Sequence, residues 1–219
     1  MKHLVWLVCV CVISTTLKAY AGAKMDINSN SWLDVGLMGQ VYFQNLDNAD
    51  DRSDVYLRRG RIILQGQIQD GVKFFAETDN DNAGKAETAV ATDVQDVFVD
   101  IRVAAMEAGD HWIKAGLILL PFSFENRSGA GSLLGLDYNS EVIKLVNTFV
   151  YRDYGAELHG NISDKFAYFV GVFDGYDTKG CEKNPNADVR LTGHLAYNLA
   201  GKAETGFFYS QERLGAKGN

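Results

Sequence analysis

Charged side chains recur at alternate positions along one stretch of this chain, from about residue 55 to residue 79. Its outgoing half carries, at alternate positions, Arg59, Arg61, Gln65 and Gln67. Its returning half, beyond Asp70-Gly71, carries Lys73, Glu77 and Asp79 in the same way. Guanidinium and ammonium groups are suited to phosphate and other anions, whereas carboxylates on the same surface oppose such binding. This stretch is therefore the first candidate for a surface that handles small ions.

The alternation itself predicts β-strands. In the first stretch the intervening residues include Ile62, Leu64 and Ile68, and in residues 92–104 they are Val97, Val99, Ile101 and Val103. Successive side chains of a strand point to opposite faces, so each strand has one polar and one apolar face. We expect about nine strands, after a loose start over residues 22–32. The expected strands are 33–45, 53–69, 72–79, 92–104, 111–119, 152–162, 166–173, 189–197 and 202–211.

The first 21 residues predict a secretory signal peptide, which leaves residues 22–219 as one mature domain. Lys2 precedes an apolar run from Leu4 to Ile13, and Ala19-Tyr20-Ala21 provides an A-x-A cleavage motif. The run is shorter than the about 20 apolar residues that span a bilayer. Two of the three cysteines lie inside this run, so Cys181 remains alone and no intrachain disulfide is expected.

Charge and composition restrict the class of the mature protein. The formal charge of -7 becomes more negative when Lys2 and Lys18 leave with the signal, and no basic block remains to bind nucleic acid. No later segment has 18 unbroken apolar residues, so a helical membrane protein is not expected. An exported, glycine-rich chain of alternating segments is either a secreted β-sandwich or an outer-membrane β-barrel.

Short and long connections alternate between the expected strands, which favours the barrel. The short ones are Asp70-Gly71, Met106–Asp110, Ser163–Lys165 and Ala200-Gly201. Transmembrane barrels have short turns at one end and longer loops at the other. In a barrel the apolar face meets lipid, and the polar face lines a water-filled pore. The candidate pore-lining residues are Arg59, Arg61, Lys73, Glu77, Asp96, Asp100, Arg102, Lys114, Glu157 and Arg190.

Cations and carboxylates share this polar face, so two interpretations stay open. One is a cationic wall that prefers anions, and the other is a mixed, paired wall that allows general diffusion. The alternation also stops between Leu120 and Arg152. A non-strand insertion of this length inside a β pattern is usually functional.

Several segments together resemble one known family. They are Leu57-Arg-Arg-Gly-Arg-Ile-Ile-Leu-Gln-Gly66, Asp70-Gly-Val-Lys-Phe-Phe-Ala-Glu77, Gly116–Glu125 with its Pro121-Phe122, and Arg152-Asp-Tyr-Gly155. In this order and spacing, the chain from about Leu33 onward resembles the phosphate-selective porin O and P family of outer-membrane channels. The resemblance implies an antiparallel 16-stranded barrel, usually trimeric, with a long loop after the fifth strand that folds into the pore.

The resemblance places residues 120–152 in that constriction loop. The loop residues it singles out are Pro121, Phe122, Glu125, Arg127, Asp137, Tyr138 and Lys144. Two departures from the family pattern matter. The run Gly116-Leu-Ile-Leu-Leu-Pro121 lacks the polar and basic residues that the family often has before the proline, which weakens the inference of anion selectivity. About nine strands is also fewer than the family barrel, so we expect the chain to form an N-terminal part of it.

Catalytic and metal-binding motifs are missing from the sequence. Neither G-x-S-x-G nor H-E-x-x-H occurs. Asp79-x-Asp81 begins like a calcium loop, but Ala83 and Val90 stand where oxygen ligands are required. We therefore expect no enzymatic activity, no metal and no cofactor.

The sequence predicts a passive outer-membrane porin of a Gram-negative bacterium. Its expected partners are outer-membrane lipid, small solutes or inorganic anions such as phosphate, and copies of itself in a homotrimer. Two alternatives remain: an outer-membrane barrel with a structural or binding role, and a secreted β-sandwich binding module. Recovery without detergent in the soluble periplasmic fraction would exclude both barrel interpretations.

Overall fold

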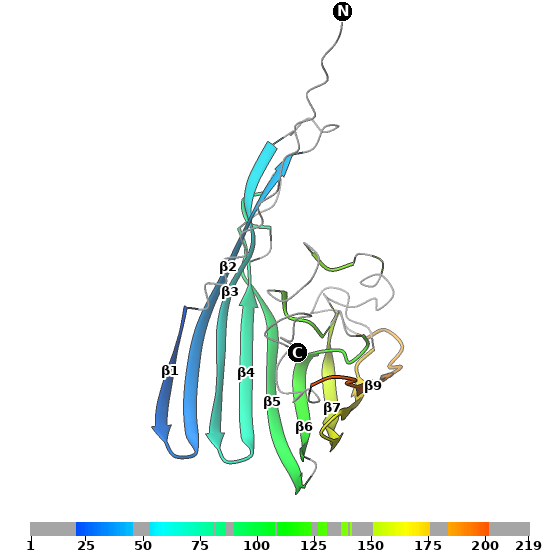
Figure 1. Cartoon of the computed structure of the whole chain (residues 1–219). Coiled ribbons are helices and arrows are strands. Elements are labelled where there is room, and N and C mark those ends of the chain that lie inside the picture. The colour runs from blue at the N-terminus through cyan, green and yellow to red at the C-terminus, as the bar shows by residue number, and fades with distance from the viewer. Residues whose placement is uncertain are drawn as a thin grey trace, which may run out of the picture.

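Nine strands form a single antiparallel sheet in which each strand pairs with the next one along the chain (Figure 1). The computed structural model describes residues 21–45, 53–80, 82–85, 90–107, 109–123, 127–130, 137–139, 141, 151–175 and 184–201. The strands are β1 (Ala21–Asn28), β2 (Ser31–Asn45), β3 (Ser53–Gln69), β4 (Val72–Asp79), β5 (Asp93–Met106), β6 (Gly109–Leu119), β7 (Arg152–Ser163), β8 (Phe166–Phe173) and β9 (Arg190–Tyr197). The sheet is open, with β1 and β9 as its two edges among the described residues.

The predicted fold class is confirmed: the described part of the chain is all-β, with consecutive antiparallel strands. Short turns join neighbouring strands at one end of the sheet, as the connection lengths indicated. At the β3–β4 turn Gly71 has a φ of 75°, a backbone conformation that glycine adopts at no steric cost and that tight hairpins require. Within the described residues, no helix has the length and apolar character needed to cross a membrane.

The alternation of β5 shows why these segments are strands with two different faces. Asp96, Phe98 and Asp100 are buried on one face of the sheet. The side chains between them, including Val97 and Val99, are 48% and 41% exposed on the other face. Similar exposed apolar side chains continue across the sheet at Leu37, Ile62, Ile113, Leu158, Val170 and Leu191. The outer face is therefore a broad apolar surface.

Strands β2 and β3 extend beyond their neighbours as a two-stranded ribbon (Figure 1). Their pairing continues to Asn45 and Ser53, whereas the pairing of β1 with β2 stops at Leu37. A bulge interrupts the ladder within this ribbon, because Gln40 pairs with Arg59 and Val41 pairs with Leu57. The extra residue is Arg58. A bulge of this kind turns the side chain of the extra residue in a new direction.

The expectation of a loose start over residues 22–32 is wrong. Residues 21–28 form the edge strand β1, which pairs with β2 from Ala21↔Leu37 to Asn28↔Ser31. The Asn30 amide donates a hydrogen bond of 2.9 Å to the Asn28 side chain in the connecting turn. The polar composition suggested a coil, but an edge strand tolerates polar residues on both faces. The expected strand 202–211 and Cys181 lie outside the described residues, so the nine observed strands are not the nine expected ones.

Candidate functional site

A row of alternating charges crosses the inner, buried face of the sheet, which we call the charged face. Register pairs Lys73 of β4 with Asp100 of β5, Asp100 with Lys114 of β6, and Lys114 with Glu157 of β7. The Lys114 ammonium lies 3.7 Å from Glu157. Opposite charges in directly opposed positions stabilise antiparallel strands, by about 0.2–1 kcal/mol a pair. The row therefore cancels its own charge across four neighbouring strands.

Next to this row, two carboxylates of like charge are directly opposed. Glu77 of β4 pairs in register with Asp96 of β5, and both are buried. Like charges in such positions repel each other, so each needs a cation. Arg61 of β3 binds Glu77 and also donates to Asp79 at 2.8 Å, and Arg152 at the start of β7 donates to Asp96 at 2.9 Å. These buried ion pairs join β3 to β4, and join β7 to β5 across the intervening β6.

Apolar side chains also occupy the inner face and form a cluster with residues from outside the strands. Ile63, Phe75, Phe98, Ile118 and Phe173 come from β3, β4, β5, β6 and β8, and they meet Leu120 and Tyr151 from the connection between β6 and β7. This inner apolar cluster explains why Ile63 stands among the polar residues of β3. The Phe75 and Phe98 rings stack with centroids 5.2 Å apart. The inner face is therefore charged and apolar at once, and the connection between β6 and β7 packs against it.

That connection, residues 120–151, is called the inward segment because its described residues contact the inner face at two distant strands. At one contact, Asp137 accepts hydrogen bonds from Arg58 (2.7 Å) and Arg59 (2.5 Å) of β3. Burial alone would raise the pKa of the Asp137 carboxyl, but the two guanidinium groups outweigh burial and hold that pKa below its ordinary value of 3.8. The carboxylate is therefore charged at neutral pH.

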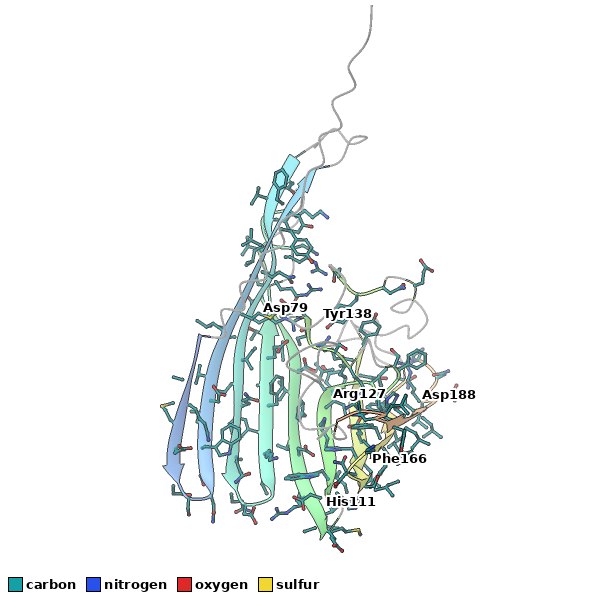
Figure 2. All side chains as sticks on the ribbon, viewed as in Figure 1. Asp79, His111, Arg127, Tyr138, Phe166 and Asp188 are labelled. Carbon is teal, nitrogen blue, oxygen red and sulfur yellow. The ribbon has the colours of Figure 1, made fainter. Side chains whose placement is uncertain are left out.

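The second contact lies at β8, where the Arg127 guanidinium carbon sits 3.4 Å from the centre of the Phe169 ring. Tyr138 holds the two parts of the inward segment together, because its hydroxyl donates to the Ser128 carbonyl oxygen at 2.8 Å. Burial raises the pKa of the Tyr138 hydroxyl, which remains protonated. Figure 2 labels Tyr138 close to Asp79 and Arg127 nearer to the curled end of the sheet that holds β6, β7 and β9. The described residues of the inward segment therefore contact the inner face at both β3 and β8.

The structure places the predicted pore-lining residues on one face and buries most of them. Buried on the charged face are Arg59, Arg61, Glu77, Asp96, Asp100, Lys114 and Glu157. Partly exposed on it are Lys73, Arg102 and Arg190. Arg102 lies at the turn end of the sheet, where it binds Asp70 and Asp110. The charges are thus brought together as pairs rather than as a row of cations.

The residues singled out in the inward segment are placed less completely. Pro121 and Arg127 are buried, whereas Phe122 is exposed. Asp137 and Tyr138 lie next to Arg59, whose guanidinium carbon is 5.5 Å from the Tyr138 ring. Glu125 and Lys144 lie outside the described residues.

Three residues that bind carboxylates on the inner face were not among the predicted site residues: Arg58, Arg152 and His159. Arg58 broke the alternation of β3, and the bulge there is the reason. Alternation would send Arg152 outward, but the preceding Tyr151 has a φ of 67°, and Arg152 turns inward to Asp96. His159 shares the polar spacing of β7 and lies 3.0 Å from Asp100. Of the three residues, only His159 could have been identified from the sequence, by its position in the polar alternation of β7.

Comparison with known proteins assigns the chain to a family. The family described as phosphate-selective porin O and P matches residues 26–217 of the chain. No curated protein and no solved structure matches the chain. The family match covers nearly all of the described strands and the whole of the inward segment. The chain therefore belongs to the phosphate-selective porin O and P family.

Proposed function

We propose that the protein is an outer-membrane porin through which small polar solutes, including phosphate and other small anions, diffuse passively. The observation that carries this proposal is the division of one sheet into an exposed apolar face and a charged face. Closed antiparallel sheets are one of the two structures that can span a bilayer, because their backbone groups are all paired, and the open sheet of β1 to β9 would form part of such a barrel. A transmembrane barrel turns its apolar face to lipid and its polar face to the channel. Membership in a family of channels supports the same conclusion and argues against catalysis.

The inward segment is the proposed constriction of this channel. Its described residues contact β3 through Asp137 and β8 through Arg127. A solute would then pass beside the segment, and the charged groups that remain in contact with water would set its selectivity. The constriction residues are proposed as Pro121, Phe122, Glu125, Arg127, Asp137, Tyr138 and Lys144.

Phosphate is proposed as a solute on the family description, with only a weak preference for anions. Arg61, Lys114 and Arg152 each have a carboxylate partner on the charged face. A paired guanidinium attracts a passing anion less than an unpaired one does, because the field of the neighbouring carboxylate opposes it. We therefore favour the mixed, paired wall over a cationic wall.

The location and assembly follow from the same proposal. Residues 1–21 would direct export and be removed, and the mature chain would fold in the outer membrane of a Gram-negative bacterium. The broad apolar outer face would contact outer-membrane lipid and neighbouring copies in a homotrimer. The predicted cleavage after Ala21 leaves β1 nearly whole, since this strand begins at Ala21.

Reconstitution into planar bilayers tests the channel directly. We expect stepwise conductance increases in KCl, together with a reversal potential in a salt gradient that lies slightly toward the chloride equilibrium potential. A protein that needs detergent for extraction but conducts no ions would instead be a structural or binding barrel. Recovery in the soluble periplasmic fraction would contradict every barrel interpretation.

A further inference from the structure

The arginines of β3 have partners of two origins. Arg61 binds Glu77 and Asp79, which both belong to the neighbouring strand β4. Arg58 and Arg59 bind Asp137, which lies 78 residues beyond Arg59 in the inward segment. A carboxylate on a neighbouring strand is fixed by the backbone ladder, whereas a carboxylate on a connecting segment is held by side-chain contacts. The negative charge beside Arg59 is therefore supplied by the proposed constriction itself.

Water reaches the pair from the side of the segment. The Asp137 side chain is 34% exposed, whereas the Arg59 side chain is 3% exposed. Besides Asp137, Arg59 donates to the uncharged Gln40 amide oxygen at 2.8 Å. Asp137 thus lies between the β3 guanidinium groups and water, and its charge decides the strength of the positive field that a solute meets there.

We propose that Asp137 determines the charge selectivity of the channel by neutralising Arg58 and Arg59 at the constriction. This inference rests on the proposed porin function and deepens it. With Asp137 ionised, its carboxylate offsets part of the positive field of Arg58 and Arg59, so anions such as phosphate are attracted weakly. Without the carboxylate, the same two guanidinium groups attract anions more strongly and repel cations. Asp137 is thus a selectivity residue that acts against anions, although it lies in an arginine-rich site.

The size of the effect follows from Coulomb attraction at contact distance. Removing one unit charge about 4 Å from the path of an ion in water changes its local concentration about fivefold, and salt reduces the change. We therefore expect Asp137→Asn to raise the anion-to-cation permeability ratio about three- to fivefold in dilute salt. The asparagine keeps the shape of the side chain, and its Oδ1 can still accept a hydrogen bond from one of the two arginines.

The test measures reversal potentials of the full chain in planar bilayers across a KCl gradient in dilute salt. Asp110→Asn is the matched control, because Asp110 is also 34% exposed and also pairs with an arginine, Arg102, at 3.3 Å. Asp110 lies at the turn end of β6, away from the inward segment, so its substitution should leave the ratio nearly unchanged. In the double variant Asp137→Asn with Arg59→Gln, the ratio should return toward the wild-type value.

Conductance in concentrated KCl separates an effect on the charge of the pore from an effect on its width. At 1 M salt the screening length is only about 3 Å, so conductance then depends mainly on the width of the pore. An unchanged permeability ratio in Asp137→Asn would overturn the proposal. So would a change in high-salt conductance alone, since that result would make Asp137 a purely structural residue. An equal gain in Asp110→Asn, or a gain that persists fully without Arg59, would also overturn it. Wild-type protein that conducts nothing would instead contradict the porin function.

Discussion

The ion pairs between strands and the ion pairs of the inward segment use the same residue types in different settings. Arg61 is fully enclosed, and its two carboxylates stand on the adjacent strand. The partner of Arg59 is one-third exposed and belongs to a connection. Enclosed pairs cannot lose one member without leaving a buried charge, whereas a pair open to water can. The first kind joins neighbouring strands inside the sheet, and the second kind is the one proposed to regulate what passes beside it.

The sharpest way to break this comparison is to remove the enclosed cation. We expect Arg61→Met to lower the free energy of unfolding by about 3–5 kcal/mol, because two buried carboxylates, Glu77 and Asp79, would lose a buried partner. Urea unfolding, followed by the shift between folded and unfolded migration in electrophoresis, measures this change. Arg59→Met, two residues away on the same strand, is the control. It should lower the free energy of unfolding by about 1 kcal/mol, since Asp137 would still accept a hydrogen bond from Arg58 and would still contact water. Equal costs would show that the two kinds of pair do not differ.

A smaller effect is expected within the inward segment. Tyr138→Phe removes the hydrogen bond to the Ser128 carbonyl but keeps the ring against Tyr151 and Arg59. The segment should lose about 1 kcal/mol of local stability, seen as roughly fivefold faster proteolysis between residues 120 and 151. Unfolding of the sheet should not change. Tyr197→Phe, on the exposed outer face, serves as control. Equally fast proteolysis of the inward segment in this variant would contradict the role given to the hydrogen bond of Tyr138.

The smallest expected effect is the pH dependence of Asp137. Its pKa is lower in the folded protein than its ordinary value of 3.8, so the pair with Arg58 and Arg59 is fully present above pH 3.8. The stabilisation is lost as pH falls below 3.8 through the lowered pKa. Because Asp137 is partly exposed, the loss should not exceed about 1 kcal/mol.

Reversal potentials between pH 6 and pH 3 measure this titration. Tyr42 of β2 also lies near the carboxylate, but its hydroxyl stays neutral over this range. Other carboxylates titrate as well, so the useful quantity is the difference between wild type and Asp137→Asn. We expect a component toward anion preference that is present in wild type and missing in the variant. Identical titrations in the two proteins would remove Asp137 from the constriction.

Much of the fold was predictable because period-2 alternation reports directly on strand faces. Residues 92–104 predicted both faces of β5, and the alternation of short and long connections predicted consecutive antiparallel pairing. The strand β1 was missed, because an edge strand in a polar segment carries no clear alternation. The predicted site residues were identified as a polar face from spacing alone.

The partners of these site residues were not predictable, since they depend on register and on irregular backbone. Glu77 opposes Asp96 only in the observed register, and the need for Arg152 follows from that opposition. A bulge directs Arg58, and the left-handed conformation of Tyr151 precedes the inward turn of Arg152. The inner apolar cluster required a connection to fold back over the sheet, which local sequence patterns do not show.

The row Lys73–Asp100–Lys114–Glu157 has a consequence for how the strands insert beside one another during assembly. A slip of one residue between β4 and β5 would turn Asp100 toward the hydrocarbon core, where a charge is costly. A slip of two would keep the faces but place Lys73 opposite Phe98 or Arg102 instead of Asp100. The row thus distinguishes the correct register from both neighbouring errors. Each oppositely charged pair therefore disfavours a misplaced neighbouring strand as the sheet forms.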